Sequence, residues 1–303
     1  MSGLITLVLI LSPMFIGFLL PSRPEWVKMS ETALGYLVFL LLIVIGIELG
    51  LVQDLAEKIG AIAMYLGVLM LLTLSSGVVA LWAFDRFSPQ HTTRTDTQGS
   101  KPKVSLRGSL VQLICLAIGF GLAQILPAAL LPPERTTTVL LMALLFLVGI
   151  SLKGSGVSLR EAMLNKRGCQ ISVIFMAVTL LSGVIYALIF SEVSFAKALA
   201  LASGFGWYSL SGTIMTDAYG AVWGSVALLN DLGREIVALI VIPMLMRHST
   251  SAGIGLGGVT SLDFTLPTIL QSGGTQIMPV VISFGFITNV VSPILMVLFS
   301  QLG

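Results

Sequence analysis

The stretch "ALLNDLGREIVALIVIPMLM", residues 227–246, is long and apolar enough to cross a bilayer but carries four polar groups. Asn230, Asp231, Arg234 and Glu235 fall within six consecutive positions. An ionised side chain at the centre of a membrane helix costs about 2.5–3.5 kcal/mol on insertion scales, so such groups should face the protein interior and compensate one another. The stretch therefore predicts a membrane helix with one polar side turned toward the protein.

The composition of the whole chain supports this interpretation. The 303 residues are 56% hydrophobic and only 10% charged, and the mean hydropathy is +1.01. Ordinary soluble domains do not show such values, so an integral membrane protein is indicated. Eight apolar windows have about the length that a membrane-spanning helix needs. They are residues 2–20, 33–50, 61–84, 109–126, 137–152, 169–190, 222–246 and 277–300.

The basic residues predict how these spans are oriented. The connections after the first, third and fifth spans hold two, five and four Lys or Arg residues, whereas the alternate connections hold one each. Positive charge gathers on the cytoplasmic side, so both termini are expected on the side of the membrane away from the cytoplasm. The first window lacks a basic leader and a small-residue cleavage site, so we expect a retained helix and not a signal peptide.

An internal repeat is suggested by two similar segments, residues 16–49 and 118–152. Each begins Ile-Gly-Phe, continues through a proline, and ends in an apolar helix with Gly-Ile-Xaa-Leu, in which Gly46 corresponds to Gly149. The offset of 102 to 103 residues covers three spans, and an odd number of spans turns the second copy upside down. Chance similarity between glycine-rich helices is the alternative.

The repeat suggests a division of the chain into four parts. Residues 1–84 would form the first three-helix unit and residues 109–190 the inverted second one. The polar stretch between them, 85–108, has the composition of a mobile cytoplasmic linker. Residues 191–303 would then form the substrate-binding unit.

Two segments of that last unit do not make good continuous spans. Residues 201–220, "LASGFGWYSLSGTIMTDAYG", and 255–274, "GIGLGGVTSLDFTLPTILQSGG", are rich in Gly, Ser and Thr and precede apolar helices. Irregular backbone at membrane depth is tolerated only inside protein or beside a water-filled cavity, so paired broken or re-entrant helices are predicted. Eight spans result if both segments re-enter, and ten if both cross. Small residues also serve plain helix packing, which is the alternative.

The charge balance of the opening stretch points to a cation site. Two carboxylates and one guanidinium leave one negative charge over, and Asp263 in "TSLDFTLP" could add a second. A surplus buried carboxylate can take up and release protons near neutral pH. The competing interpretation is a buried ion network that only fixes helix packing.

Other polar groups carry weaker signals. Glu48 and Asp54 bracket the outward end of the second span, where a solvated connection is the simpler explanation. Trp207 and Tyr208 could stack on an ammonium group or anchor the chain at the membrane interface. Cys115 and Cys169 have no spacing typical of a disulfide or metal site, so packed thiols are expected.

Several function classes are not supported. The chain has no phosphate-binding glycine loop and no cluster of His and Cys residues. We therefore expect no enzymatic activity, no cofactor, no bound metal and no nucleic-acid partner. The sequence leaves the oligomeric state open, and a homo-oligomer is one of the states it allows.

Three motifs together resemble the bacterial lysine exporter family of the LysO type. They are "LASGFGWYSLSG" (201–212), the pairs "ND" and "RE" at 230–235, and "TSLDFTLP" (260–267). The resemblance implies export of L-lysine across the bacterial inner membrane, with the termini in the periplasm and toxic lysine analogues as further cargo. The candidate binding residues are Asn230, Asp231, Arg234, Glu235, Gly204, Trp207, Tyr208, Ser209, Thr260 and Asp263, with Glu48 and Asp54 as weaker candidates.

A mechanism follows from the charge of lysine. Moving one positive charge outward against an inside-negative potential costs about 2.3 kcal/mol per 100 mV. Entry of one proton for each lysine cancels this electrical cost. Glu235 and Asp263, with Asp231 as a third candidate, would bind ammonium groups when ionised and take protons as lysine leaves. Arg234 would bind the substrate carboxylate or pair with a carboxylate that has lost its proton.

Two rival functions stay open on sequence grounds. An antiporter that exchanges Na⁺ for H⁺ would also use buried acids and broken helices. A membrane scaffold without transport activity would use the same charges only to pack its helices.

Overall fold

A computed structural model describes most of the chain, and the residues it describes form helices and no strands. They are residues 12–13, 15–21, 24–51, 55–88, 107–127, 130–133, 136–154, 165–262 and 264–303. The elements are α2 (Pro24–Gly50), α3 (Leu55–Phe87), α4 (Arg107–Ile125), α5 (Thr136–Gly154), α7 (Lys166–Ile189), α8 (Phe195–Ala202), α9 (Tyr208–Tyr219), α10 (Ala221–Leu245), α11 (Thr250–Gly257), η2 (Gly258–Leu262), α12 (Leu266–Gly273), η3 (Thr275–Ile277) and α13 (Met278–Ser300).

Four of the described helices are long and apolar enough to cross a membrane, which supports the predicted class of an all-helical membrane protein. These stretches are Pro24–Ile47, Ile62–Phe87, Lys166–Ile189 and Met278–Ser300. The helix α10 has 25 residues and equals them in length, but three charged residues lie in its middle. The count of eight spans stays a prediction, and the first predicted span falls mostly on residues 1–11, outside the described part.

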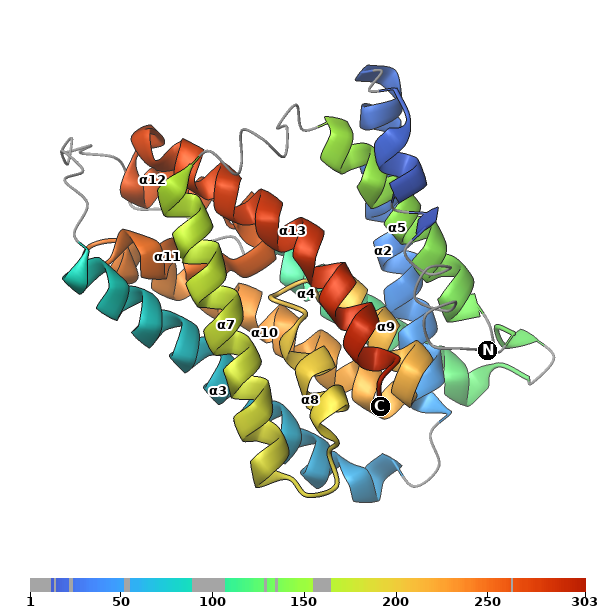
Figure 1. The fold of residues 1–303 in the computed structure, drawn as a ribbon. Coiled ribbons are helices and arrows are strands. Elements are labelled where there is room, and N and C mark those ends of the chain that lie inside the picture. The colour runs from blue at the N-terminus through green and yellow to red at the C-terminus, as the bar shows by residue number, and fades with distance from the viewer. Residues whose placement is uncertain are drawn as a thin grey trace.

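The long helices form two groups (Figure 1). The helix α2 packs against α4 and α5, while α3 packs against α7. The last helix, α13, contacts α7, α8 and α9, and α10 lies between α9, α11 and α3. Helix α10 therefore has neighbours from several separate parts of the chain.

Glycines allow the closest helix contacts on the α2 side. A Cβ on Gly119 of α4 would overlap the carbonyl oxygen of Ile43 in α2, and one on Gly46 would overlap the carbonyl oxygen of Leu116. Small residues let helix backbones approach in this way, and the resulting van der Waals contact replaces the hydrophobic drive that lipid does not provide. The α2–α4 pair therefore depends on the absence of side chains at these positions.

The segment 195–219 is a hairpin whose arms are α8 and α9. The ammonium of Lys197, near the start of α8, lies 5.0 Å from the ring of Tyr219 at the end of α9, so both outer ends of the hairpin lie together. The chain between the arms, 203–207, is not helical, and Phe205 (φ 52°) and Gly206 (φ 97°) adopt left-handed backbone there. The break predicted in 201–220 is confirmed.

The segment 250–273 is a second hairpin, made of α11, η2 and α12. Added Cβ atoms on Gly253 in the first arm and Gly273 in the second would both meet the side chain of Met246, so these two arms also begin and end together. Between the arms the α-helix gives way to the short 3-10 helix η2, which starts at Gly258 with φ 58°. The break predicted in 255–274 is confirmed as well.

The two hairpins enter the bundle from opposite ends and meet inside it. The first follows directly after the C-terminal end of α7, whereas the second begins where Ser251 accepts a 3.2 Å hydrogen bond from Arg167, near the start of α7. At the meeting point the backbone N–H of Val259 donates a 2.9 Å hydrogen bond to the carbonyl of Phe205. We call residues 203–207 the first tip and residues 257–262 the second tip.

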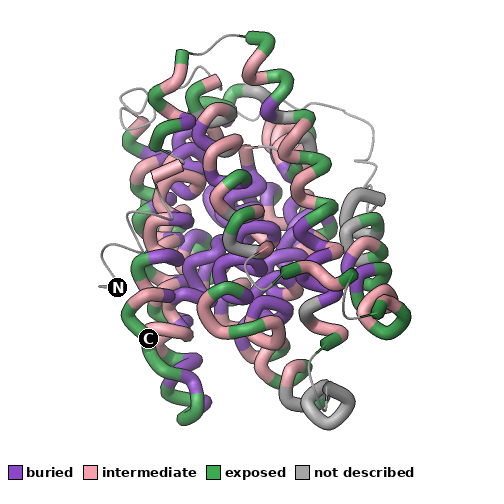
Figure 2. The backbone as a smooth tube through the Cα atoms, turned by 90° about the vertical axis from the view of Figure 1, so that its right-hand side faces the viewer, coloured by how far each residue is buried: buried purple, intermediate pink, exposed green. Residues whose placement is uncertain are grey.

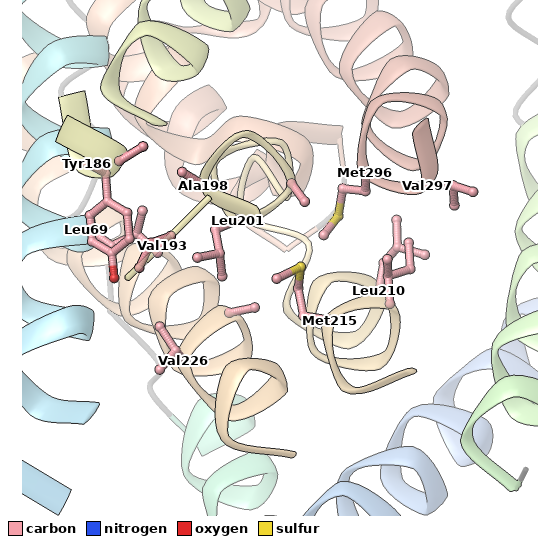
Figure 3. Packing of buried hydrophobic residues seen from close by; sticks show 14 of the residues in the cluster. Leu69, Tyr186, Val193, Ala198, Leu201, Leu210, Met215, Val226, Met296 and Val297 are labelled. Atoms are coloured by element: carbon pink, nitrogen blue, oxygen red, sulfur yellow. The ribbon is translucent and has the colours of Figure 1, made fainter. Parts of the chain in front are cut away.

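Burial is concentrated around these hairpins (Figure 2). One large apolar cluster joins α3, α7, the first hairpin, α10 and α13, and Figure 3 shows Leu69, Tyr186, Leu201, Met215 and Met296 as members of it. A second cluster, around Phe175 and Phe205, packs the other side of the tips. The apolar core therefore fixes both hairpins against α10.

The predicted borders differ slightly from the helix ends. The helix α3 continues past residue 84 to Phe87, so the first residues of the predicted linker are helical, and α4 begins at Arg107. Residues 89–106 lie outside the described part. The division into four parts stays a prediction.

The α2–α4 contact predicts a difference between two glycines of α4. Gly119→Ala places a methyl group where the Ile43 carbonyl lies, and overpacking of this kind costs about 1–3 kcal/mol. Gly121 has no atom within 4 Å of an added Cβ, so Gly121→Ala should be neutral or slightly stabilising. Thermal unfolding of the detergent-solubilised variants measures both, and equal midpoints would contradict the proposed importance of this contact.

Candidate functional site

The four polar residues of α10 lie in the protein interior. The exposed fractions of Asn230, Asp231, Arg234 and Glu235 are 2%, 1%, 2% and 1%. None of the four faces the surface of the bundle, so lipid cannot be their surroundings. Their desolvation must instead be offset by protein groups or by a ligand.

The carboxylate of Asp231 binds the first tip. Its Oδ1 accepts a 3.2 Å hydrogen bond from the backbone N–H of Gly206 and a 3.0 Å bond from the amide of Asn230. A Cβ on Gly204 would overlap its other oxygen, Oδ2, so only glycine leaves room for the carboxylate at this position. The glycine-rich sequence of the tip is thus explained by the acid on the neighbouring helix.

The guanidinium of Arg234 lies where both tips meet α3 and α7. It donates a 3.2 Å hydrogen bond to the carbonyl of Thr73 in α3, and its Cζ lies 5.5 Å from the ring centroid of Phe175 in α7. Its aliphatic part packs against Gly206 and Gly258, one glycine from each tip. Arg234 is therefore in contact with four separate elements of the fold.

Several polar atoms of this cluster have no hydrogen-bond partner among the described residues. They are Oδ1 of Asn230, Oδ2 of Asp231 and Nε of Arg234. Buried polar atoms are normally paired, because each unpaired one costs about 1–3 kcal/mol. Unpaired acceptors and a donor at one place leave hydrogen-bonding capacity for a small polar ligand.

The cluster is also negative overall. Asp231 and Glu235 contribute two carboxylates and Arg234 one guanidinium. Counted together, these residues have one more negative than positive group. A ligand with an excess of positive charge would bring the cluster closer to neutrality.

The other predicted residues occupy different places around the tips. Trp207 is half-buried between the two large apolar clusters, and Tyr208 packs against the apolar residues of α2, α4 and α10. Ser209 is buried at the start of α9, where its carbonyl accepts a bond from Thr213. The hydroxyl of Thr260 donates to the carbonyl of Gly257 and so closes the second tip on itself.

Three predicted residues lie outside what the structure describes. Asp263 and Asp54 fall in the gaps of the described ranges. The backbone of Glu48 belongs to α2, but its side chain is not described. Their predicted roles stay predictions.

Sequence reasoning missed the contribution of α13. The amide of Asn289 donates a 3.2 Å bond to the carbonyl of Val259 in the second tip. The hydroxyl of Ser292 lies 2.8 Å from the carbonyl of Ser203 and 3.2 Å from that of Gly204, both in the first tip. Polar residues three positions apart in an apolar helix were the available signal. The contact from Thr73 has no signal in the sequence, because Thr73 makes it with its backbone carbonyl.

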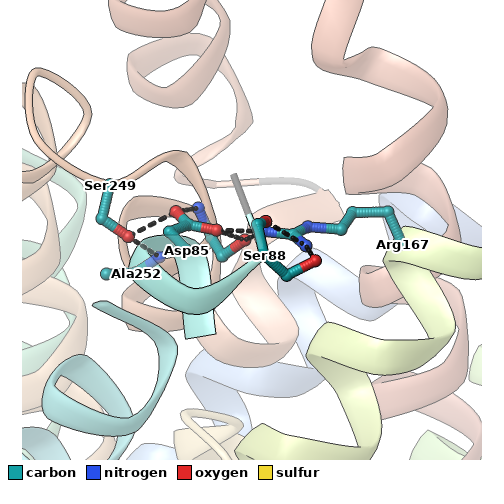
Figure 4. Close-up of polar contacts among 6 residues, drawn as sticks. Asp85, Ser88, Arg167, Ser249 and Ala252 are labelled. Carbon is teal, nitrogen blue, oxygen red and sulfur yellow. Dashed lines mark hydrogen bonds and ion pairs between the residues drawn. The ribbon is translucent and has the colours of Figure 1, made fainter. Parts of the chain in front are cut away.

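A second, partly buried polar cluster, missed in the same way, lies at the outer end of the second hairpin (Figure 4). We call it the Asp85 cluster. Asp85 of α3 forms an ion pair with Arg167 of α7 and accepts hydrogen bonds from Ser249 and Ser251 at the start of α11. Arg167 also donates to the carbonyl of Ser88, at 3.0 Å. Three segments far apart in sequence supply these groups, so no local pattern could join them.

Comparison with known proteins shows the family of the chain. A family model described as "Lysine exporter LysO" matches residues 113–300, which include both hairpins and α10. The "Lysine exporter LysO" of Escherichia coli (strain K12) is 38% identical over 298 residues, 97% of this chain and 98% of the relative. The chain belongs to the lysine exporter family.

A further relative in this family supports the assignment. The "Putative lysine exporter" of Haemophilus influenzae (strain ATCC 51907 / DSM 11121 / KW20 / Rd) is 46% identical over 169 residues, 56% of this chain and 86% of that one. No solved structure matches the chain. The resemblance to lysine exporters that the three sequence motifs indicated is confirmed.

The bonds from α13 predict a loss of stability in Ser292→Ala. Removing the hydroxyl deprives the buried carbonyl of Ser203 of this donor, which costs about 1–3 kcal/mol, whereas the carbonyl of Gly204 keeps the N–H of Trp207. Ser75→Ala is a suitable control, since the exposed Ser75 donates to carbonyls of its own helix. We expect a lower unfolding temperature for Ser292→Ala alone, and a shift of equal size in Ser75→Ala would refute the role of this hydroxyl.

Proposed function

We propose that the protein exports L-lysine across the bacterial inner membrane by proton antiport. The single observation that carries this proposal is the net-negative, partly unpaired cluster of α10 at the meeting point of the two tips. The family supplies the substrate, because its relatives are named as lysine exporters. Toxic lysine analogues that keep both ammonium groups would be further cargo.

Lysine fits this cluster by its charges. It carries two ammonium groups and one carboxylate, and the cluster offers the complementary two carboxylates and one guanidinium. Asp231 and Glu235 would bind the ammonium groups, while Arg234 binds the carboxylate through its forked donors. Asp263, which follows the second tip in sequence, would serve as a further acid.

Proton coupling follows from competition for the same acids. A carboxylate that holds a lysine ammonium cannot hold a proton, so each species displaces the other. Exchange of one lysine for one proton moves no net charge, which removes the electrical cost of about 2.3 kcal/mol per 100 mV. The proton and lysine gradients alone would then drive export.

We also propose that the N-terminal two-thirds are an inverted repeat. One supporting observation is that Gly17 packs against the backbone of Phe146, while Gly119 packs against that of Ile43. Gly119 follows Gly17 by 102 residues, and Phe146 follows Ile43 by 103, which matches the offset of the two similar segments. A glycine of each copy thus packs against the corresponding helix of the other copy.

The proposed topology has eight spans, two re-entrant hairpins and both termini in the periplasm. The first hairpin would enter from the periplasm and the second from the cytoplasm. The shared ends of each hairpin support re-entry over full crossing. Inverted hairpins that meet near the midplane are the arrangement in which secondary transporters bind their substrates.

The central prediction concerns exchange in proteoliposomes. Vesicles loaded with unlabelled lysine should take up labelled lysine at the same rate with and without Na⁺. An interior made acidic should drive net lysine uptake, because protons leave as lysine enters. Movement of Na⁺ against H⁺ without lysine exchange would support the Na⁺ antiporter, and indifference to the pH gradient would exclude proton coupling.

A second prediction separates transport from a packing role of the α10 charges. Glu235→Gln removes one of the two carboxylates of α10 with little change in volume, so lysine exchange should fall at least tenfold while the unfolding temperature stays near that of the wild type. The control Asp217→Asn makes the matching change at an exposed position at the end of α9. A scaffold would show the opposite result for Glu235→Gln: lower stability with unchanged lysine tolerance of the cells.

A further inference from the structure

The Asp85 cluster and the α10 site are joined by three shared elements. Helix α3 carries Asp85 in the cluster and Thr73 in the site. Helix α7 carries Arg167 in the cluster and Phe175 beneath the guanidinium of Arg234. At a rise of 1.5 Å per residue, these pairs lie about 18 Å and about 12 Å apart along their helices.

The third element is α11, the first arm of the second hairpin. It begins in the Asp85 cluster, where Ser249 and Ser251 donate to the carboxylate, and ends at Gly257 beside the site. Both ends of α11 are therefore defined by polar contacts. Its N-terminal end belongs to the cluster, and the second tip that follows its C-terminal end contacts Phe205 and Arg234.

The helix α11 depends on its neighbours for its position, through its apolar residues in the second cluster and through the polar contacts at its start. It has only eight residues, fewer than an isolated helix needs to be stable in water, and three of them are glycines. Its N-cap, Ser249, accepts a 3.0 Å bond from Ala252 and donates a 2.6 Å bond to Asp85. Asp85 also accepts the backbone N–H of Ser251 at 2.9 Å, so a negative charge from α3 caps the positive end of this helix.

Arg167 adds further contacts to the Asp85 cluster. Its guanidinium pairs with Asp85, donates to the carbonyl of Ser88 and lies 4.0 Å from the ring centroid of Phe84. The side chains of Arg167 and Asp85 are only 9% and 16% exposed, so water screens the pair weakly. The start of α11 is thereby held to α3 and α7 at once.

We propose that Asp85 and Arg167 are positioning residues for transport, which hold α11 so that the second tip lies against Arg234 in the form that binds substrate. This inference rests on the proposed transport of lysine through the α10 site. Neither residue touches the substrate. Both act through the second tip, whose Gly258 and Val259 meet Phe205 and Arg234.

A definite kinetic signature follows from this role. When only a fraction of molecules holds the tip correctly, the apparent dissociation constant rises by the inverse of that fraction. Saturating lysine selects the competent form and restores most of the maximal rate. Loss of the contacts between the Asp85 cluster and α11 should therefore raise KM much more than it lowers Vmax.

The first experiment measures lysine exchange in proteoliposomes with Asp85→Asn and Arg167→Gln. We expect KM to rise about tenfold or more in both, with Vmax within about threefold of the wild type. Arg167→Lys keeps the charge but loses the forked donors, so its KM should lie between the KM of the wild type and that of Arg167→Gln. Arg86→Gln is the control, since it removes a positive charge from the adjacent position of α3. An unchanged KM with a large fall in Vmax would overturn the proposal in favour of a contact that must break during transport.

A second measurement does not depend on lysine, so it tests the positioning role separately from the proposed transport function. In a background with Cys115→Ser and Cys169→Ser, Val259→Cys places a thiol at the buried second tip. Its reaction with a small maleimide should be at least ten times faster when Asp85→Asn or Arg167→Gln is added, and unchanged with Arg86→Gln. Faster labelling in a protein that does not exchange lysine would refute the proposed function alone, whereas equal labelling rates would refute the positioning role.

If Asp85→Asn does not fold, Ser251→Ala takes its place. It removes one donor to Asp85 and leaves the ion pair with Arg167 intact. We expect changes in the same direction as for Asp85→Asn but smaller, with about a threefold rise in KM and in the labelling rate. No change in either quantity would count against the proposal.

Discussion

Non-helical backbone buried inside an apolar bundle must find its hydrogen bonds within the protein, and the rest of this structure is arranged around that requirement. Both hairpins lose their α-helical pattern at the tips, which are buried. In the bond from Val259 to Phe205, the second tip supplies the donor and the first tip the acceptor. Asp231 and Ser292 bind further groups of the first tip, and Asn289 binds the second.

This requirement explains why polar residues stand in α10 and α13 at all. An acid in a membrane helix is costly, but here the N–H of Gly206 and the amide of Asn230 offset part of the cost for Asp231. The same acid keeps one oxygen unpaired, as Arg234 keeps its Nε. Groups that hold the tips in place are thus the same groups that remain able to bind a ligand.

The carboxylates of the two polar clusters differ in how completely they are paired. In the Asp85 cluster, the carboxylate receives donors from α7 and from the start of α11. The α10 cluster retains unpaired atoms and a surplus of negative charge. A fully paired carboxylate suits the fixing of an element, whereas one with an unpaired oxygen suits exchange between a substrate and a proton.

The sequence by itself determined the membrane class, the two interrupted segments and the polar stripe of α10, because hydropathy, glycine content and helical spacing are local properties of the chain. Only the tertiary structure decided which partners these groups meet. The Thr73 carbonyl at Arg234 has no side-chain signature, and Asp85 was grouped with a polar linker although it binds residues about 80 and 165 positions later. Contacts between remote segments depend on how helices pack in space, and the spacing of residues along one helix carries no record of that packing.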